Sequence, residues 1–582
     1  MLAVRRLYVY GVTFAAQWVV LTGLANLLRV LVELALGLPS PDPSFLAAPE
    51  YFRQRVSLFG ALLLVGTPIW AGHWWAASRL AAPDDPAGAA ERRSLVRQAY
   101  LYASLLGAAG IVAFQAIAAI QGLLAVWLDL PGPRGPALSA TVLGKLFWCA
   151  AAAALWGYLW RLAQQDRRRS GEQPGGALIR RLEVFAAVFI AMLLMAVAAA
   201  GLLWLAWRAV FEQPTTVSLG APWWVSPLAR YIPAVVVWAA GWMVHWRIAE
   251  GWLAQPELQA QERHAPLRRL FLYLAVFIAV AFTLTNLSRL LYGFLLAALG
   301  DPRPGGQPLL LGAGRPLSWI AVFLPLWWYH WQVLRRDAAA LPLGEPQAGI
   351  RRLYVYLMAA LSLAFLATGL GLLFSSLVDI AAVDVVTAGR GPQLSDASLR
   401  AKVSFAATSV LVGLPVWGWH WGTAQRFAGD VTQGWLERRS LSRRIYLYLA
   451  IFAAVVTILG AGAAFLFQVL NALLGARVDV AYWRVLGNEL GAVLVAAGIL
   501  AYHVPVLRAD LQATPAATVA PEAAPERVRL VLTVEVPTTV ERSAVAAQVA
   551  RALGPDGRVL DVVRQAGTAA DTKSDDAGTT PA

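Results

Sequence analysis

A basic opening, two arginines in five copies and Arg-Gln in one, is followed by aromatic residues six times along the chain, and each copy begins an apolar segment of about 30 residues. The copies read RRLYVY at 5–10, RQAYLY at 97–102, RRLEVF at 180–185, RRLFLY at 268–273, RRLYVY at 351–356 and RRIYLY at 443–448. Successive openings are 92, 83, 88, 83 and 92 residues apart. Self-similarity at a nearly constant period indicates one structural unit that is used many times, so we treat the chain as a tandem repeat.

Each repeat contains two apolar segments separated by a loop rich in glycine and proline, such as GLPSPDPSFLAAPE or GDPRPGGQPLLLGAGRP. The chain is 59% hydrophobic and only 14% charged, with a mean hydropathy of +0.58, whereas soluble domains are about 25% charged. A helix of about 20 apolar residues spans the hydrocarbon layer, and lipid leaves no other form for an isolated segment. The sequence therefore predicts an all-α polytopic membrane protein with about twelve transmembrane helices.

The repeats and the remaining segments predict nine regions. Repeats 1 to 6 occupy 1–92, 93–176, 177–264, 265–347, 348–439 and 440–508. Residues 509–526 are rich in alanine, proline and threonine, which is typical of a disordered linker. In 527–567, RVRLVLTVEV alternates with period two and ERSAVAAQVARALG has helical spacing, so we expect a small cytoplasmic β-α-β segment. The polar residues 568–582 are a predicted disordered tail.

Arginine and lysine are distributed unevenly, which predicts the orientation in the membrane. The segments between repeats hold 25 of them and the loops within repeats hold 13. The positive-inside rule then places the segments between repeats and both termini in the cytoplasm, and we expect a bacterial plasma membrane. The net charge of +14 suits anionic lipid headgroups, and no basic stripe remains for nucleic acid. The single cysteine, Cys149, excludes an intrachain disulfide.

The second apolar segment of each repeat ends in a block of tryptophan and histidine, as in PLWWYHWQVLRR at 325–336. Histidine occupies the same position in five repeats, as His73, His245, His330, His420 and His503, and Leu159 replaces it in repeat 2. One interpretation is an interfacial aromatic belt, with each imidazole near the carbonyl groups at a helix end. The weaker alternative is a histidine ring that binds a metal, a porphyrin-like cofactor or protons. The belt is favoured because no intramembrane carboxylate adjoins the histidines in sequence, so we predict no metal site and no cofactor.

The basic openings and the tryptophans are typical of interfacial anchors, which combine snorkelling cations with aromatic rings at the headgroup level. Alternatively, the arginines bind the linker of one repeat to the next or hold phospholipid headgroups. The predicted anchors are Arg5, Arg6, Trp70, Trp74, Trp242, Trp246, Arg268, Arg269, Trp327, Trp331, Arg351, Arg352, Trp417, Trp421, Arg443 and Arg444.

The RRLYVY opening, the long first apolar segment and the block GLPVWGWHWGTAQR together closely resemble the bacterial membrane repeats called domain of unknown function 5671. The resemblance covers about residues 5–508 and is closest in repeats 1, 4 and 5. It implies a membrane module of paired helices and supplies no catalytic residues.

No phosphate-binding loop, zinc-protease, nucleophile-elbow or C-x-x-C motif occurs, so we do not predict an enzyme and name no catalytic residue. The favoured hypothesis is a non-catalytic membrane scaffold, or a module that binds lipid or a protein partner, with the C-terminal segment as the candidate surface for the protein partner. The alternative is a transporter or channel built from two parallel six-helix halves, repeats 1–3 and repeats 4–6. A weaker alternative is a cofactor-binding membrane protein that uses the histidine and tryptophan stripes.

Overall fold

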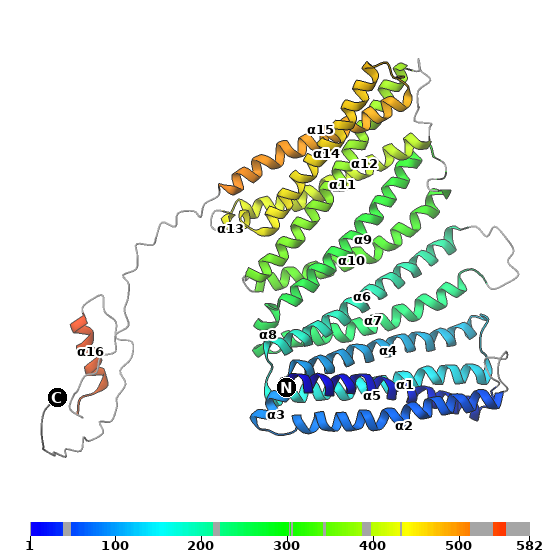
Figure 1. Ribbon diagram of the computed structural model, residues 1–582, viewed down its shortest axis with the longest axis vertical. Coiled ribbons are helices and arrows are strands. Elements are labelled where there is room, and N and C mark those ends of the chain that lie inside the picture. Colours follow the sequence, from blue (N-terminus) through cyan, green and yellow to red (C-terminus); the bar gives the residue numbers. More distant parts are fainter. Residues whose placement is uncertain are drawn as a thin grey trace, which may run out of the picture. The chain divides into compact units, whose positions relative to one another are not determined.

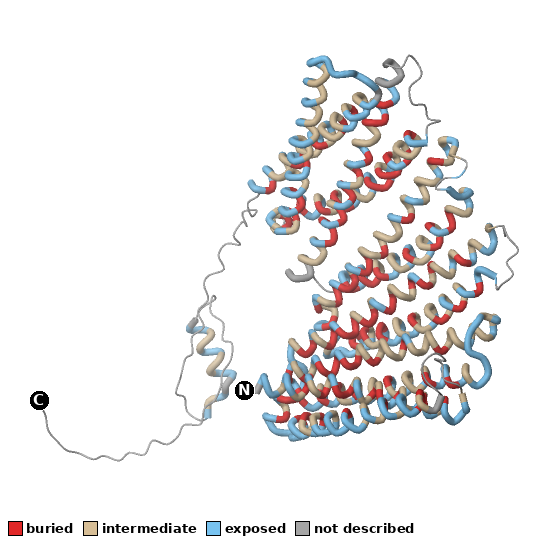
Figure 2. The backbone as a smooth tube through the Cα atoms, turned by 45° about the vertical axis from the view of Figure 1, so that its right-hand side comes forward, coloured by how far each residue is buried: buried red, intermediate tan, exposed pale blue. Residues whose placement is uncertain are grey.

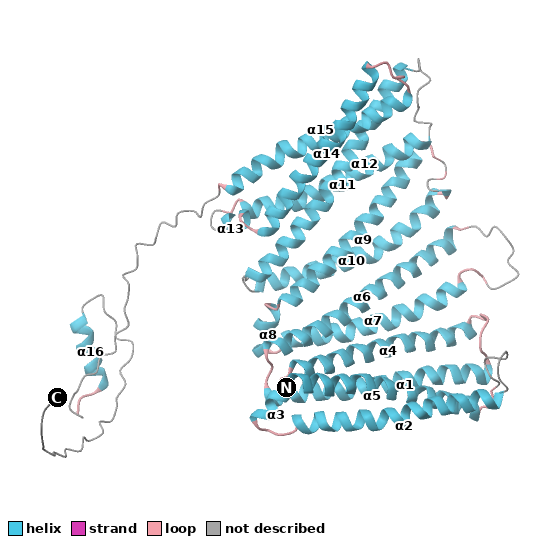
Figure 3. Ribbon diagram, viewed as in Figure 1, coloured by secondary structure: helices cyan, strands magenta, loops and turns pink. Residues whose placement is uncertain are grey.

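The structure, a computed structural model, describes residues 2–38, 48–212, 222–301, 303, 306–340, 345–386, 397–430, 434–512 and 539–553. Its internal contacts divide it into two compact units, Met1–Ala516 and Ala517–Ala582. Helices are the only long regular elements in these described ranges, where no strand occurs (Figure 3).

Twelve long helices form six antiparallel hairpins, numbered 1 to 6 in chain order (Figure 1). The hairpins are α1 (Leu2–Ala35) with α2 (Ala48–Ala81), α4 (Leu95–Trp127) with α5 (Gly135–Ser170), α6 (Pro174–Phe211) with α7 (Val225–Leu253), α9 (Pro266–Ala298) with α10 (Leu309–Ala340), α11 (Glu345–Val386) with α12 (Ala397–Ala428), and α14 (Leu441–Leu473) with α15 (Val480–Leu511). All twelve are long and apolar enough to cross a membrane. The predicted all-α architecture and the number of candidate spans are confirmed.

Three short helices, which were not predicted from the sequence, follow the second helices of the odd-numbered hairpins. They are α3 (Pro86–Arg92), α8 (Pro256–Arg263) and α13 (Gly434–Arg438). Proline opens α3 and α8, where its missing N–H is no loss, and the Asp85 carboxylate caps α3 by accepting from the Gly88 N–H at 2.7 Å. Because these helices recur every second hairpin, the structural period is a pair of hairpins. We call hairpins 1–2, 3–4 and 5–6 modules A, B and C.

The hairpins of Met1–Ala516 stack in a row. The first helix of each hairpin packs against the second helix of the next, in the pairs α1–α5, α4–α7, α6–α10, α9–α12 and α11–α15. The first helices also pack against one another in succession. No extensive contact joins the described helices of hairpin 1 to those of hairpin 6. The fold is therefore an open array in which each hairpin depends on its neighbours, as in other repeat proteins.

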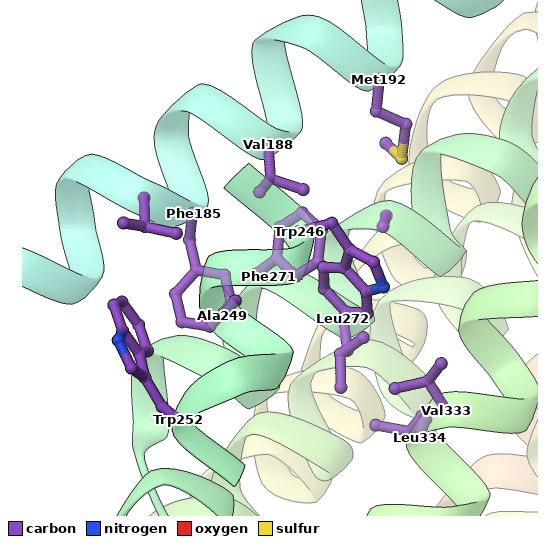
Figure 4. Close-up of a cluster of buried hydrophobic side chains, with 12 residues drawn as sticks. Phe185, Val188, Met192, Trp246, Ala249, Trp252, Phe271, Leu272, Val333 and Leu334 are labelled. Carbon is purple, nitrogen blue, oxygen red and sulfur yellow. The ribbon is translucent and has the colours of Figure 1, made fainter. Parts of the chain in front are cut away.

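The largest buried clusters lie where the basic openings meet the tryptophan and histidine blocks, one cluster to a module. Figure 4 shows the cluster of module B, in which Trp246 and Phe271 pack between Phe185 and Leu272. Along the remainder of each long helix, buried residues alternate with exposed ones (Figure 2). Exposed leucines and valines on these outer faces suit contact with lipid tails.

The C-terminal prediction is supported only in its helix. α16 (Arg542–Leu553) lies where ERSAVAAQVARALG predicted a helix. The two predicted strands of the β-α-β segment, the linker and the polar tail lie almost entirely outside the described residues. The described residues of this segment contain only this helix, so nothing in them supports the β-α-β arrangement.

In hairpin 5, two glycines allow the helices to cross at close range. A Cβ atom on Gly413 of α12 would lie 2.9 Å from the Leu366 backbone nitrogen, and one on Gly369 of α11 would lie 2.9 Å from the Ala406 carbonyl oxygen. Small residues of this kind let membrane helices approach one another. α12 also contains Gly418, where an added Cβ would meet no atom within 4 Å.

We expect Gly413→Ala to destabilise the protein by about 1–3 kcal/mol, because the new methyl group overlaps backbone that cannot move aside. Gly418→Ala is the matched control and should leave stability unchanged or raise it, because alanine favours the helix. Thermal unfolding in detergent compares the two variants. Equal midpoints would show that α11 and α12 are not held at this crossing.

Candidate functional site

Each even-numbered hairpin holds a buried arginine–aspartate pair between the start of its first helix and the end of its second. The arginine is the first residue of the basic opening, and the aspartate lies seven residues after the histidine position. The Nε–Oδ2 distances are 2.7 Å for Arg97–Asp166, 2.7 Å for Arg268–Asp337 and 2.5 Å for Arg443–Asp510. All six side chains are buried. A buried charge of either sign requires its partner, so each pair closes its hairpin at this end.

Each odd-numbered hairpin uses a glutamate from its short helix instead. Glu91 of α3, Glu262 of α8 and Glu437 of α13 are buried. They accept hydrogen bonds from the second arginine of the opening of the same hairpin, with Arg6 at 2.7 Å, Arg181 at 2.9 Å and Arg352 at 2.8 Å. The short helices therefore return to the start of the first helix. They are the counterparts of the aspartates in the even hairpins.

A tyrosine joins the two kinds of pair within modules A and C. In module A, the Tyr10 hydroxyl donates to Glu91 at 3.0 Å and accepts from the Arg97 Nη1 at 3.0 Å. In module C, the Tyr356 hydroxyl lies 2.9 Å from Glu437 and 3.5 Å from the Arg443 Nη1. A continuous buried chain of polar groups therefore runs from the odd hairpin into the even one.

Module B lacks this hydroxyl, because phenylalanine stands at position 185. Here Arg180 donates to Glu262 at 2.6 Å, in addition to Arg181. Burial would raise the pKa of the Glu262 carboxyl, but the hydrogen bonds and charges of Arg181 and Arg180 outweigh it and hold the pKa below its usual value. Glu262 therefore stays ionised and contributes most to stability above the ordinary pKa of glutamate. This contribution is lost as the pH falls through the lowered pKa.

Tryptophan adds a second link that is identical in the three modules. The indole N–H of the odd hairpin donates to a tyrosine hydroxyl of the even hairpin, in Trp74–Tyr158 at 2.9 Å, Trp246–Tyr329 at 2.6 Å and Trp421–Tyr502 at 2.7 Å. The same rings lie against the even-hairpin arginines, with Arg97, Arg268 and Arg443 at 5.9, 5.6 and 5.2 Å from the ring centroid. A cation over an indole face gains further attraction when it is desolvated.

Of the sixteen predicted interfacial anchors, six are buried, eight are partly covered and two are exposed. Arg268, Arg269 and Arg443 are buried, whereas Arg5 and Arg444 are exposed. Arg6, Arg351 and Arg352 are partly covered and lie within ion-pair distance of glutamates. Among the tryptophans, Trp74, Trp246 and Trp421 are buried, and Trp70, Trp242, Trp327, Trp331 and Trp417 are half-buried. The ion pairs of Arg6, Arg351, Arg352 and Arg443 lie within one hairpin. Arg268 binds Asp337 of its own hairpin and also Glu250 of the preceding one, at 2.7 Å each.

The five aligned histidines form separate sites, one in each of hairpins 1, 3, 4, 5 and 6. Each Nδ1 lies 2.8–2.9 Å from the carbonyl oxygen four residues earlier, so it carries the proton and leaves Nε2 as an acceptor; the residues are His73, His245, His330, His420 and His503. Tyrosine hydroxyls of the basic openings lie 3.3, 3.3 and 3.1 Å from this Nε2 in the pairs Tyr8–His73, Tyr354–His420 and Tyr446–His503. Within the described ranges, no three His, Cys, Asp or Glu side chains are grouped so that they could hold a metal ion.

Module B again departs from this pattern. Glu183 and Phe271 occupy the positions of these tyrosines, and the buried Nε2 atoms of His245 and His330 have no hydrogen-bond partner among the described residues. The buried Glu183 Oε2 also has none. Sequence reasoning did not single out Glu183, although RRLEVF is the only opening with a carboxylate at this position. Unpaired buried polar groups cost free energy, so module B has room for a stabilising change.

We expect Arg97→Met to destabilise the protein by about 3–5 kcal/mol, because it leaves Asp166 buried without its counter-ion. Adding Asp166→Leu should recover much of the loss, since a well-packed apolar pair replaces a buried ion pair at little cost. Arg161→Met is the control, because Arg161 is exposed. Thermal unfolding midpoints in detergent rank the stabilities of the three variants. If the midpoint of Arg97→Met is no lower than that of Arg161→Met, the pair has no structural role.

Glu183→Tyr should raise the thermal midpoint, because it restores in hairpin 3 the hydroxyl that meets Nε2 in hairpins 1 and 5. The gain expected for one buried hydrogen bond is about 1 kcal/mol. Glu183→Phe supplies the ring without the hydroxyl and should gain less. Adding His245→Leu to each variant should remove the stability advantage of Glu183→Tyr over Glu183→Phe. If the advantage remains, it does not come from a hydrogen bond to His245.

Comparison with known proteins matches the chain to a family model. The model is described as Domain of unknown function (DUF5671), and it matches residues 6–150, 202–314, 304–383 and 352–499. Neither the curated proteins nor the solved structures contain a match. The matched residues cover most of the chain in several successive segments, so the chain belongs to the DUF5671 family.

Proposed function

We propose that the protein is a non-catalytic membrane scaffold that binds anionic lipid headgroups at its arginine-rich end. In this proposal that end and both termini lie in the cytoplasm of a bacterial cell, as the distribution of arginine and lysine favours. The observation that supports it is the division of the arginines of this end into two groups. One group is buried and pairs the helices with one another, and the other is exposed.

The exposed group lies at the ends of the second helices, in the segments that connect hairpins and at the last basic opening. It includes Arg79, Arg161, Arg168, Arg169, Arg247, Arg335, Arg426 and Arg444. Arginines at this level contribute about 1 kcal/mol each to attraction by an anionic leaflet. Because each of the six hairpins supplies at least one of them, the row presents a cationic edge to the headgroups.

The contact pattern supports a scaffold over a transporter with two equivalent halves. Such halves would make hairpins 1 and 4 counterparts, and each would repeat the contacts of the other. Hairpin 1 instead closes through Glu91 of a short helix, whereas hairpin 4 closes through Asp337 of its own second helix. The boundary between the halves would also fall inside module B. The histidines give no support to cofactor binding, because they lie in separate hairpins.

Lipid binding is tested in nanodiscs made with phosphatidylcholine alone or with added phosphatidylglycerol. We expect phosphatidylglycerol to raise the thermal midpoint by several degrees, and salt to reduce the gain because exposed charges are screened. The combined variant Arg168→Gln, Arg169→Gln and Arg335→Gln should lose most of the stabilisation by phosphatidylglycerol.

The matched control is the combined variant Arg230→Gln, Arg315→Gln and Arg484→Gln, which removes three exposed arginines at the opposite end of the helices. It should retain the gain from phosphatidylglycerol. If both triple variants respond alike, the arginine-rich end has no special role in binding headgroups, and the proposal fails.

A further inference from the structure

The face that each hairpin presents to the next is repeated along the first helices. It consists of the residues 5, 9, 12 and 16 positions after the first residue of the basic opening, which lie on one side of a helix. In hairpin 4 these residues are Tyr273, Phe277, Val280 and Leu284, and all four pack against the buried cluster of module C. In hairpin 2 the last of them, Ala113, packs with Ala191 and Trp238 of hairpin 3. We call this surface the forward face.

The forward face is covered in hairpins 1 to 5 and uncovered in hairpin 6. Its first residue is buried in four of the five internal hairpins, as in Tyr10 and Tyr356, and half-buried in Tyr273. In hairpin 6 the face consists of Tyr448, Phe452, Val455 and Leu459, which are 52, 66, 39 and 68% exposed. An exposed apolar face in a membrane protein can be satisfied by lipid, so exposure by itself identifies no partner.

The identity of the residues is what points to a partner. Tyr448, Phe452, Val455 and Leu459 repeat the forward face of hairpin 4, Tyr273, Phe277, Val280 and Leu284, without a change. Hairpin 5, which covers that face in hairpin 4, opens with RRLYVY at 351–356, and hairpin 1 opens with the same six residues at 5–10. The uncovered face of hairpin 6 and the start of hairpin 1 are therefore the two halves of an interface that this chain already makes.

The contact residue of hairpin 1 is also held in the required conformation. In hairpin 5, Tyr354 meets Tyr273 of hairpin 4 with ring centroids 5.4 Å apart, while its hydroxyl lies 3.3 Å from His420. Tyr8 is its equivalent in hairpin 1, and its hydroxyl lies 3.3 Å from His73. The ring pairs Tyr8–His73 and Tyr354–His420 also match, at 5.5 and 5.6 Å. Tyr8 is 60% exposed, whereas Tyr354, which packs against hairpin 4, is buried.

We infer that hairpin 1 of a second copy of this chain docks on the forward face of hairpin 6, so that copies join head to tail in the membrane. The contact is heterologous, since different surfaces of the two copies meet, and it extends the row rather than closing a twofold dimer. Tyr448 meets Tyr8 of the second copy as Tyr273 meets Tyr354 within one chain. This inference rests on the proposed scaffold and names a protein partner for it.

Cysteine cross-linking in native membranes tests the contact, and the chain suits it because Cys149 is the single cysteine. In a Cys149→Ala background, Tyr8→Cys with Tyr448→Cys is oxidised, and the products are separated under non-reducing conditions. We expect dimers and longer oligomers that persist as the protein is diluted with lipid. The internal control is Tyr273→Cys with Tyr354→Cys, which should cross-link within one chain.

The matched external control is Tyr8→Cys with Ile445→Cys. Ile445 is as exposed as Tyr448, but its equivalents Leu182, Leu270 and Leu353 are exposed in internal hairpins too, so this position faces away from the neighbour. Oligomers that form equally with Ile445→Cys, or that vanish on dilution, would be collisional and would overturn the inference. If only the internal control cross-links, the head-to-tail contact is also wrong, but the proposed scaffold is unaffected. If the internal control also fails, the hairpin array and the scaffold proposed from it are wrong.

Discussion

Buried pairing between arginine and carboxylate at one end of the helices is the constraint on which the arrangement depends. In lipid, apolar helix surfaces gain little from meeting one another rather than lipid tails, so apolar burial does not select a neighbour. A desolvated guanidinium does select a neighbouring helix, because only a correctly placed carboxylate offsets the free-energy cost of its desolvation. The pairs at Asp166, Asp337 and Asp510 thereby fix which helices are adjacent and in which register.

The same chemistry explains why the array alternates. An aspartate on the second helix reaches the opening of its own hairpin directly, as Asp166 reaches Arg97. Where Leu80, Trp252 and Phe427 take the aspartate's position, a short helix brings a glutamate back to the opening instead. In modules A and C a tyrosine hydroxyl joins the glutamate pair of the odd hairpin to the aspartate pair of the even hairpin. Two hairpins are therefore the smallest unit that contains all of these polar contacts.

The six hairpins and their helices could be predicted from the sequence, because the openings repeat and the apolar segments have the length of a membrane span. The pairing of hairpins could have been found in the alternating spacings and in ERRS, which occurs at 91–94 and again at 437–440. It was missed because each arginine lies 67 to 85 residues from its carboxylate, as in Arg443–Asp510 and Arg6–Glu91, and local patterns do not show such pairs. The arginines were therefore predicted to be anchors at the lipid surface.

Module B shows which parts of the pairing scheme are essential. It has lost the bridging hydroxyl at Phe185 and the tyrosines that meet His245 and His330, yet its arginine–carboxylate pairs and the Trp246–Tyr329 hydrogen bond are retained. Arg180 replaces the lost hydroxyl as a donor to Glu262. Neutral members of the network can thus be exchanged where the cost is one hydrogen bond, whereas the charged members cannot, because a buried charge without its partner costs several times more. The ion pairs are accordingly the part of the repeat that defines its fold.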